Sequence, residues 1–312
     1  MPRLIPCLVV FASALACLMA SHTLALGDTA TLLAAAPGFD VHPSWSPNGD
    51  LVAFSSDRSG NLDVWLIPAT GGTATQLTTG PAQDGQPAWS HDGSKIAFAS
   101  GGNWYGHIWV IPSTGGTATQ ITTNPGTDAW PSWSPDGSKI AFETNQGGQW
   151  TANWDIWVVP ASGGVVTPIV SDLTSDRAPS WSPDGSKIAF FSDRSGNEDI
   201  LVVSASGGIA TQLTTNAADD AYPAWSPDGS KIAFESNRSG NWDIWVMPAT
   251  GGTAAQVTND PGDDFDASWS PDGTRIAFSS NRSGNYDIWT ICVSGPTVVD
   301  KTTWGHIKAM FR

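Results

Sequence analysis

Carboxylates are the most regularly spaced side chains in this sequence that could do chemistry. An aspartate stands five residues before the Trp of each copy of a recurring motif. The six are Asp40, Asp84, Asp128, Asp176, Asp220 and Asp264. Their oxygens could form a ring that binds a cation such as calcium. A residue present in every repeat usually serves the repeat itself. We therefore favour structural carboxylates that accept hydrogen bonds from a turn or from an arginine.

Other catalytic patterns are missing from the sequence. It has no G-x-S-x-G motif for a serine nucleophile, no C-x-x-C motif and no phosphate-binding loop. The histidines that could hold a metal are His42, His91, His107 and His306. His42 and His107 could approach each other on one face, but too few further ligands accompany them. We therefore predict no catalytic residues, no metal site and no cofactor.

The elements that position these residues belong to a repeat. A motif close to PSWSPDGSKIAF recurs six times, and a second motif close to DIWVxPATGGTATQLT follows each copy. The Trp of the first motif falls at Trp45, Trp89, Trp133, Trp181, Trp225 and Trp269. Successive copies are 44, 44, 48, 44 and 44 residues apart. This period, with four strand-like runs per copy, predicts an all-β six-bladed β-propeller with four antiparallel strands per blade.

Each repeat divides into four short strands, called a to d here. Residues 131–134 and 139–142 are expected as strands a and b of one blade, joined by a Pro-Asp-Gly turn. Residues 243–246 and 253–258 are expected as strands c and d of another. Six Trp residues fall in strand a and five in strand c. We expect these large rings to fill the space between neighbouring blades.

Ring closure can also be predicted. Residues 27–38 align without gaps to residues 115–126, which contain a strand d. We therefore expect residues 29–34 to complete the last blade, although residues 297–299 could fill the same place. The expected organisation is a signal peptide at 1–25, a propeller at 27–296 and a tail at 297–312 whose structure the repeat does not predict.

The repeated sequences Ser-Pro-Asp-Gly-Ser-Lys-Ile-Ala-Phe and Arg-Ser-Gly-Asn-x-Asp-Ile-Trp resemble those of the TolB-type propeller family. The resemblance extends from residue 27 to about residue 295. Such propellers serve many roles, among them TolB itself, the propellers of prolyl oligopeptidase-like peptidases and some sugar-acid lyases. TolB carries an additional α/β domain, for which we expect no room here. The Gly-His and Trp-Asp signature of ordinary WD repeats does not recur from copy to copy.

The departures from the repeat predict where a partner binds. The b–c loops and the d–a connections lie on one face of a propeller and vary between copies. The longest departures fall in blades 2 and 3, where one loop is Gly-rich and the other has a four-residue insertion. Aromatic residues and a histidine gather in these segments, and we predict that they form one binding patch. The predicted patch consists of Trp104, Tyr105, His107, Trp130, Trp150 and Trp154.

Composition limits the kind of partner. The net charge is −15, and nucleic acid is excluded because phosphate binding needs a basic surface. The TolB resemblance implies a monomeric binding protein that acts on a protein or peptide of the cell envelope. A carbohydrate-binding protein or a sugar-active enzyme of the lyase or hydrolase type is the alternative, because aromatic side chains also bind sugars.

The N-terminus predicts export. Arg3 precedes an apolar run that extends to residue 20, and small residues follow it. We favour a cleaved signal peptide and a periplasmic or secreted protein with no membrane span after cleavage. Lipidation at Cys17 is less favoured because Leu15 stands where lipoprotein signals usually have a small residue.

The export prediction can be checked by intact mass. The exported protein is expected to begin near Leu26 or Ser21 and to carry no lipid. Retention of Met1, or a lipid on Cys17, would contradict the predicted cleavage.

Overall fold

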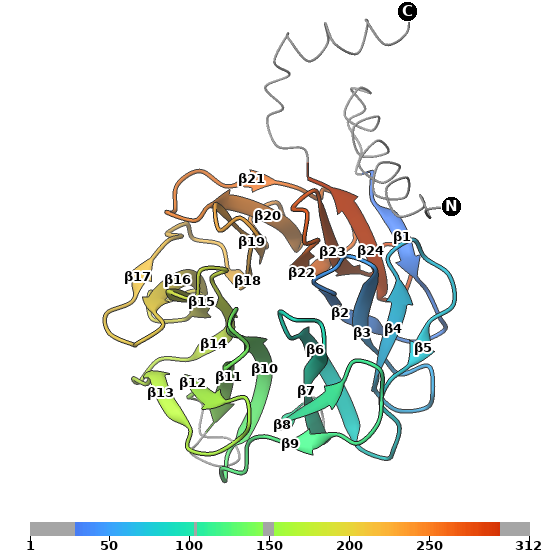
Figure 1. Ribbon diagram of the computed structural model, residues 1–312. Helices are drawn as coiled ribbons and strands as arrows, with labels where there is room; N and C mark the ends of the chain where they lie inside the picture. Colours follow the sequence, from blue (N-terminus) through green and yellow to red (C-terminus); the bar gives the residue numbers. More distant parts are fainter. Residues whose placement is uncertain (1–28, 103–104, 146–152, 294–312) are drawn as a thin grey trace, which may run out of the picture.

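The chain forms an all-β propeller, as the sequence predicts. The computed structural model describes residues 29–102, 105–145 and 153–293, and every regular element in these ranges is a β-strand. Figure 1 shows the strands arranged as a ring, with β2, β6, β10, β14, β18 and β22 around its centre. The predicted signal peptide and the tail at 297–312 lie outside the described residues. Within the described ranges no helix could cross a membrane.

The strands follow the repeat, and we number the repeats as units 1 to 6. The innermost strands, a, are β2 (Asp40–Trp45), β6 (Gln83–Trp89), β10 (Thr127–Trp133), β14 (Asp176–Trp181), β18 (Asp220–Trp225) and β22 (Asp264–Trp269). The b strands are β3 (Leu51–Ser56), β7 (Lys95–Gly102), β11 (Lys139–Asn145), β15 (Lys187–Ser192), β19 (Lys231–Ser236) and β23 (Arg275–Ser280). The c strands are β4 (Asp63–Pro68), β8 (Tyr105–Pro112), β12 (Asp155–Pro160), β16 (Asp199–Ser204), β20 (Asp243–Pro248) and β24 (Asp287–Cys292). The outermost strands, d, are β5 (Thr75–Gln76), β9 (Thr119–Gln120), β13 (Thr167–Val170), β17 (Thr211–Gln212), β21 (Ala255–Gln256) and, in unit 6, β1 (Thr31–Ala34).

Hydrogen bonding groups these strands into five sheets. Units 1, 4, 5 and 6 are each a four-stranded sheet. Units 2 and 3 form a single sheet of eight strands, because β10 pairs with β8 where Asp128 lies opposite Gly106.

The predicted closure by the N-terminal strand is confirmed. β1 runs antiparallel to β24, with Thr31 opposite Thr290 and Leu32 opposite Trp289. This pairing covers the edge of β24, and an uncovered edge strand could pair with another chain.

The turns between strands a and b have the geometry that their sequence predicts. In unit 3 the Asp136 carboxylate accepts hydrogen bonds from the Ser134 hydroxyl (2.6 Å) and from the Ser138 backbone N–H (3.0 Å). Gly137 has a φ of 69°, a conformation that suits glycine at this point of the turn.

Strand d is shorter than predicted. β21 contains only Ala255 and Gln256, whereas residues 253–258 were expected. The N–H groups of Val257 and Thr258 both approach the Ile244 carbonyl, at 2.8 and 3.3 Å, so the regular ladder ends there.

The Trp side chains pack between neighbouring units, as expected. Trp133 of unit 3 lies in one core cluster with Ala97 and Ile108 of unit 2. Its indole N–H donates to the Ala88 carbonyl of unit 2 at 3.1 Å. The core is thus a set of apolar layers between adjacent units, and these layers fix the innermost strands around a common centre.

Candidate functional site

The innermost strand of every unit contains one non-glycine residue with a positive φ. The φ values lie between 48° and 60°, a region that L side chains rarely adopt. The register of strands a and b shifts at the same point, as in a β-bulge. Each of these residues stands three positions before the strand-a Trp. They are His42, Gln86, Trp130, Ala178, Tyr222 and Asp266.

Side chains of neighbouring units hold this conformation in place. Five of the six N–H groups donate a hydrogen bond to a side chain of the preceding unit. The pairs are His42 to Ser279 (3.1 Å), Gln86 to Ser55 (2.9 Å), Trp130 to Gln86 (3.0 Å), Ala178 to Glu143 (2.8 Å) and Asp266 to Glu235 (3.1 Å). Such backbone strain costs about 1–3 kcal/mol per residue and persists only when the surroundings fix it.

The six side chains form a layer across the central channel, which we call the channel floor. The Trp130 ring lies 4.9 Å from the His42 ring and 4.5 Å from the Tyr222 ring, between centroids. These three residues come from units 3, 1 and 5, so Trp130 joins distant parts of the ring. His42 Nε2 also lies 3.9 Å from the Asp266 carboxylate of unit 6.

A cavity of about 590 Å³ extends along the channel from this floor. Its walls are the strand-a Trp residues and the prolines beside them, and its far end reaches the a–b turns at Pro47 and Pro271. A concave, largely apolar space with a few convergent polar groups is the usual form of a ligand site.

Burial shifts the pKa of two groups at or beside the floor, Glu235 and His42. Burial raises the pKa of Glu235 well above its usual value, and the nearby Asp266 carboxylate raises it further. Burial lowers the pKa of His42, although Asp266 opposes that change. The neutral forms of His42 and of Glu235, which accepts the Asp266 N–H, are therefore favoured.

The floor does not form a serine nucleophile. The Ser55 hydroxyl lies 3.3 Å from His42 Nδ1, but Ser55 is fully buried. Its oxygen already accepts the Gln86 N–H. A nucleophile must be able to reach a substrate, and the buried Ser55 hydroxyl cannot. Its contact with His42 therefore orients the imidazole.

The predicted patch over units 2 and 3 is only partly described. Trp130 lies in the channel floor, whereas the half-buried Trp154 lies beneath the Arg177 guanidinium, 4.8 Å from the ring centroid. His107 Nδ1 lies 3.3 Å from the Asp128 carboxylate. These three residues therefore have different neighbours. Trp104, Trp150 and the Tyr105 side chain lie outside the described residues, so the patch stays a prediction.

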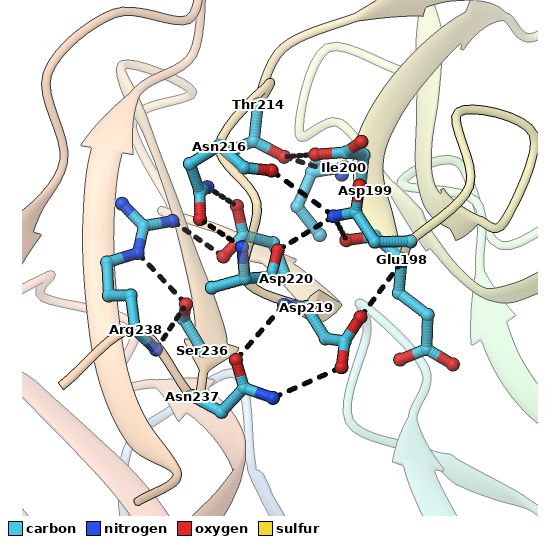
Figure 2. A network of polar contacts seen from close by, with 12 residues as sticks. Glu198, Asp199, Ile200, Thr214, Asn216, Asp219, Asp220, Ser236, Asn237 and Arg238 are labelled. Atoms are coloured by element: carbon cyan, nitrogen blue, oxygen red, sulfur yellow. Dashed lines mark hydrogen bonds and ion pairs between the residues drawn. The ribbon is translucent and has the colours of Figure 1, made fainter. Parts of the chain in front are cut away.

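The six repeated aspartates are buried, and in units 1, 4, 5 and 6 an arginine of the same unit binds the carboxylate. In Figure 2 the Asp220 carboxylate accepts a hydrogen bond from Arg238 at 2.6 Å. The same pairing joins Asp40 to Arg58, Asp176 to Arg194 and Asp264 to Arg282. The Arg238 guanidinium also lies over the Trp245 ring, 4.7 Å from its centroid. Among the described residues no group of three or more His, Cys, Asp or Glu could hold a metal ion.

Units 2 and 3 lack the arginine of this pairing. Asp128 instead accepts hydrogen bonds from Thr144 (2.6 Å) and Asn124 (2.8 Å). Burial raises the pKa of Asp84, and hydrogen bonds from Ser100 and Thr78 oppose that change.

The sequence predicts that the d–a connections vary between copies, but it does not predict that these six side chains converge. A positive φ turns each side chain toward the channel, and no glycine or asparagine at these positions indicated that conformation. One sequence feature marks these positions: in five of the six units the variable residue is followed by a proline.

Two protein-family models match this chain. The model described as TolB beta propeller domain matches residues 19–105 and 219–310, which together make more than half of the chain. The model described as Tricorn protease N-terminal beta propeller domain matches residues 149–241. No curated protein matches.

Solved structures share the fold. Putative TolB from Agrobacterium tumefaciens is 24% identical with a TM-score of 0.67, and the alignment covers 83% of this chain and 92% of that one. TolB from Acinetobacter baumannii is 23% identical with a TM-score of 0.61, covering 83% and 64%. Oligogalacturonate lyase from Vibrio parahaemolyticus is 14% identical with a TM-score of 0.61, covering 86% and 96%.

A substitution of one repeated aspartate tests its structural role. Asp220→Ala should reduce the free energy of unfolding by about 3 kcal/mol, because it leaves Arg238 without its buried partner. Asp220→Asn keeps an acceptor and should cost less. Urea and thermal unfolding measure both. Calcium should not stabilise the wild type, and a calcium stabilisation that Asp220→Ala abolishes would instead make the ring a metal site.

The pH dependence of stability follows from two groups of aspartates. Burial raises the pKa of Asp176 and Asp264 to about 6, so the folded chain binds more protons than the unfolded chain between about pH 4 and pH 6. Stability should therefore fall as the pH rises from about 4 to about 6, and this contribution is lost above pH 6. Serine hydrogen bonds lower the pKa of the turn aspartates to about 2, and their contribution is lost as the pH falls from about 4 toward 2. These are Asp92, Asp136, Asp184 and Asp228.

We therefore expect the free energy of unfolding in urea to be greatest near pH 4 and to fall between about pH 4 and pH 6. Asp264→Asn should reduce that decrease. A stability that rises steadily from pH 4 to pH 8 would show that these buried carboxylates do not control the pH dependence.

Proposed function

This chain belongs to the TolB β-propeller domain family, and from that premise we propose that it is an exported binding protein of the cell envelope. It takes a segment of a partner protein or peptide into its central channel. We further propose that it acts in the periplasm or outside the cell, as a monomer and without catalysis.

The proposal includes six blades. Each of the six units has the same four-strand order, from an innermost strand a to an outermost strand d. The eight-stranded sheet counts as two blades, because the pairing of β10 with β8 contains a single residue pair.

One observation carries the binding role: the strained position of every unit carries a different side chain. Strand a keeps its Asp and its Trp in all six units and its Pro in five, although the residue after the Asp varies too. Packing alone would favour the same residue at six equivalent places. Six different side chains on equivalent backbone positions are expected where a ligand is recognised.

The channel suits an extended peptide segment. Proline and Trp side chains line its walls and can pack against apolar groups, while serine hydroxyls and the polar side chains of the floor can form hydrogen bonds. The channel volume of about 590 Å³ lies in the range of ordinary ligand sites.

A sugar-active role is the second candidate. It draws on the histidine beside a carboxylate in the floor, where His42 Nε2 lies 3.9 Å from Asp266. The fold is also that of an oligogalacturonate lyase. The two candidates predict different ligands. The binding protein should capture a partner protein, whereas a sugar-active protein should bind or cleave acidic oligosaccharides.

The channel can be blocked without altering the outer surface. Ala267 lines the channel where five units have proline, and Ala267→Trp should fill the space beside the floor. Capture of a partner from envelope extract should be lost, while the melting temperature changes little. Ile209→Trp adds the same ring at an outer turn residue that is 98% exposed, and it should leave capture unchanged.

The same proteins applied to a glycan array provide the opposing measurement. Binding of glycans by the wild type, lost in Ala267→Trp, would support the sugar-active candidate. Capture of the partner by both variants alike would exclude the channel as the site.

A further inference from the structure

Four aromatic side chains form a continuous row on the face made by the b–c loops and the d–a connections. We call them the aromatic strip: Trp242, Phe265, Tyr286 and Phe39. Successive ring centroids lie 5.8, 5.9 and 6.3 Å apart, within the distance at which aromatic rings interact. The strip passes from unit 5 across unit 6 to unit 1, which are neighbours in the ring (Figure 1).

Folding does not require aromatic residues at these places. The Trp242 carbonyl accepts the Asp264 N–H at 2.8 Å, and the Tyr286 carbonyl accepts the Asp40 N–H at 2.8 Å. Between units 1 and 2 the same backbone bond is made by Leu62, whose side chain lies against Gly85. The backbone contact between units therefore forms with an aliphatic residue and a glycine.

The strip is also exposed to solvent. Phe39 at one end of it is 49% exposed, and the other three side chains are partly buried. An aromatic ring left in water contributes little to folding, whereas aromatic side chains commonly anchor interfaces.

Carboxylates border the strip at both ends. Asp57 accepts the Phe39 N–H at 2.8 Å, and Asp263 accepts the Trp242 N–H at 3.2 Å. The nearby Arg282 is bonded to Asp264 and is only 8% exposed. The chain as a whole carries a net charge of −15. The faces of aromatic rings and neighbouring carboxylates both attract cations.

We propose that the aromatic strip docks a protein segment in which lysine or arginine alternates with apolar side chains. The apolar groups pack on the rings, and the cations lie over the ring faces and beside Asp57 and Asp263. This surface is separate from the channel and does not depend on the proposed channel function. Sugars also stack on aromatic rings, but the carboxylates favour a cationic partner.

A labelled peptide of about 12 residues that alternates Lys with Leu and Phe serves as the probe, and fluorescence anisotropy measures its affinity for the whole exported protein. Each lost anchor should weaken binding at least about tenfold, so Phe39→Ala and Trp242→Ala should each do so. Asp57→Asn and Asp263→Asn keep an oxygen acceptor for the backbone N–H and remove only charge. They should weaken binding several-fold at low salt and less at high salt.

Three controls make the experiment decisive. Leu173→Ala removes an apolar side chain that is 99% exposed and lies outside the strip, and it should leave the affinity unchanged. Ala267→Trp should also leave it unchanged, which separates this surface from the channel. Melting temperatures within a few degrees of the wild type would show that the variants are folded.

The proposal fails if the wild type does not bind the basic peptide. It also fails if a peptide with Glu in place of Lys binds equally well, or if the strip variants keep the wild-type affinity. Binding of neutral oligosaccharides that Phe39→Ala and Trp242→Ala abolish, without binding of the peptide, would assign the strip to sugars instead.

Discussion

One residue of each innermost strand adopts a positive φ, and the candidate site depends on this constraint. The conformation turns the side chain into the channel, and in five of the six units a side chain of the preceding unit holds it by accepting the backbone N–H. The hydrogen bonds that join neighbouring units therefore also hold the floor side chains in place. A change at Glu143 or Glu235 would alter both the junction between two units and the position of a floor residue.

The arginine–aspartate pairs fix the first residue of strand a in units 1, 4, 5 and 6. In units 1, 5 and 6 the arginine also contacts the aromatic residues of strands b and c, as Arg58 does with Phe54 and Trp65. One guanidinium thus joins three strands of a unit. In unit 4, where strand c has Leu201 in place of Trp, Arg194 lies over Phe190 of strand b. Units 2 and 3 lack the arginine and share one continuous sheet, so this sector of the ring is held together by different contacts.

Much of the fold could be predicted from the sequence, because the repeat contains the turns, the strand pattern and the closing strand. The pairing of β1 with β24 followed from the match of residues 27–38 to residues 115–126. The site was less accessible to sequence reasoning. The direction of Trp130 depends on a backbone angle that its residue type does not indicate. The aromatic strip was missed because Phe39 and Phe265 lie outside the loops that break the repeat, and their proximity depends on how units 5, 6 and 1 meet.

The closing strand has a consequence for the order of folding. The Thr290 hydroxyl donates to the Thr31 carbonyl across a sequence separation of 259 residues. The last sheet therefore cannot be completed until almost the whole propeller has been synthesised. Contacts of such high separation form slowly, because the entropy of closing the long loop opposes them. Under the export proposed above, this delay would keep the ring open while its final strands are still being delivered.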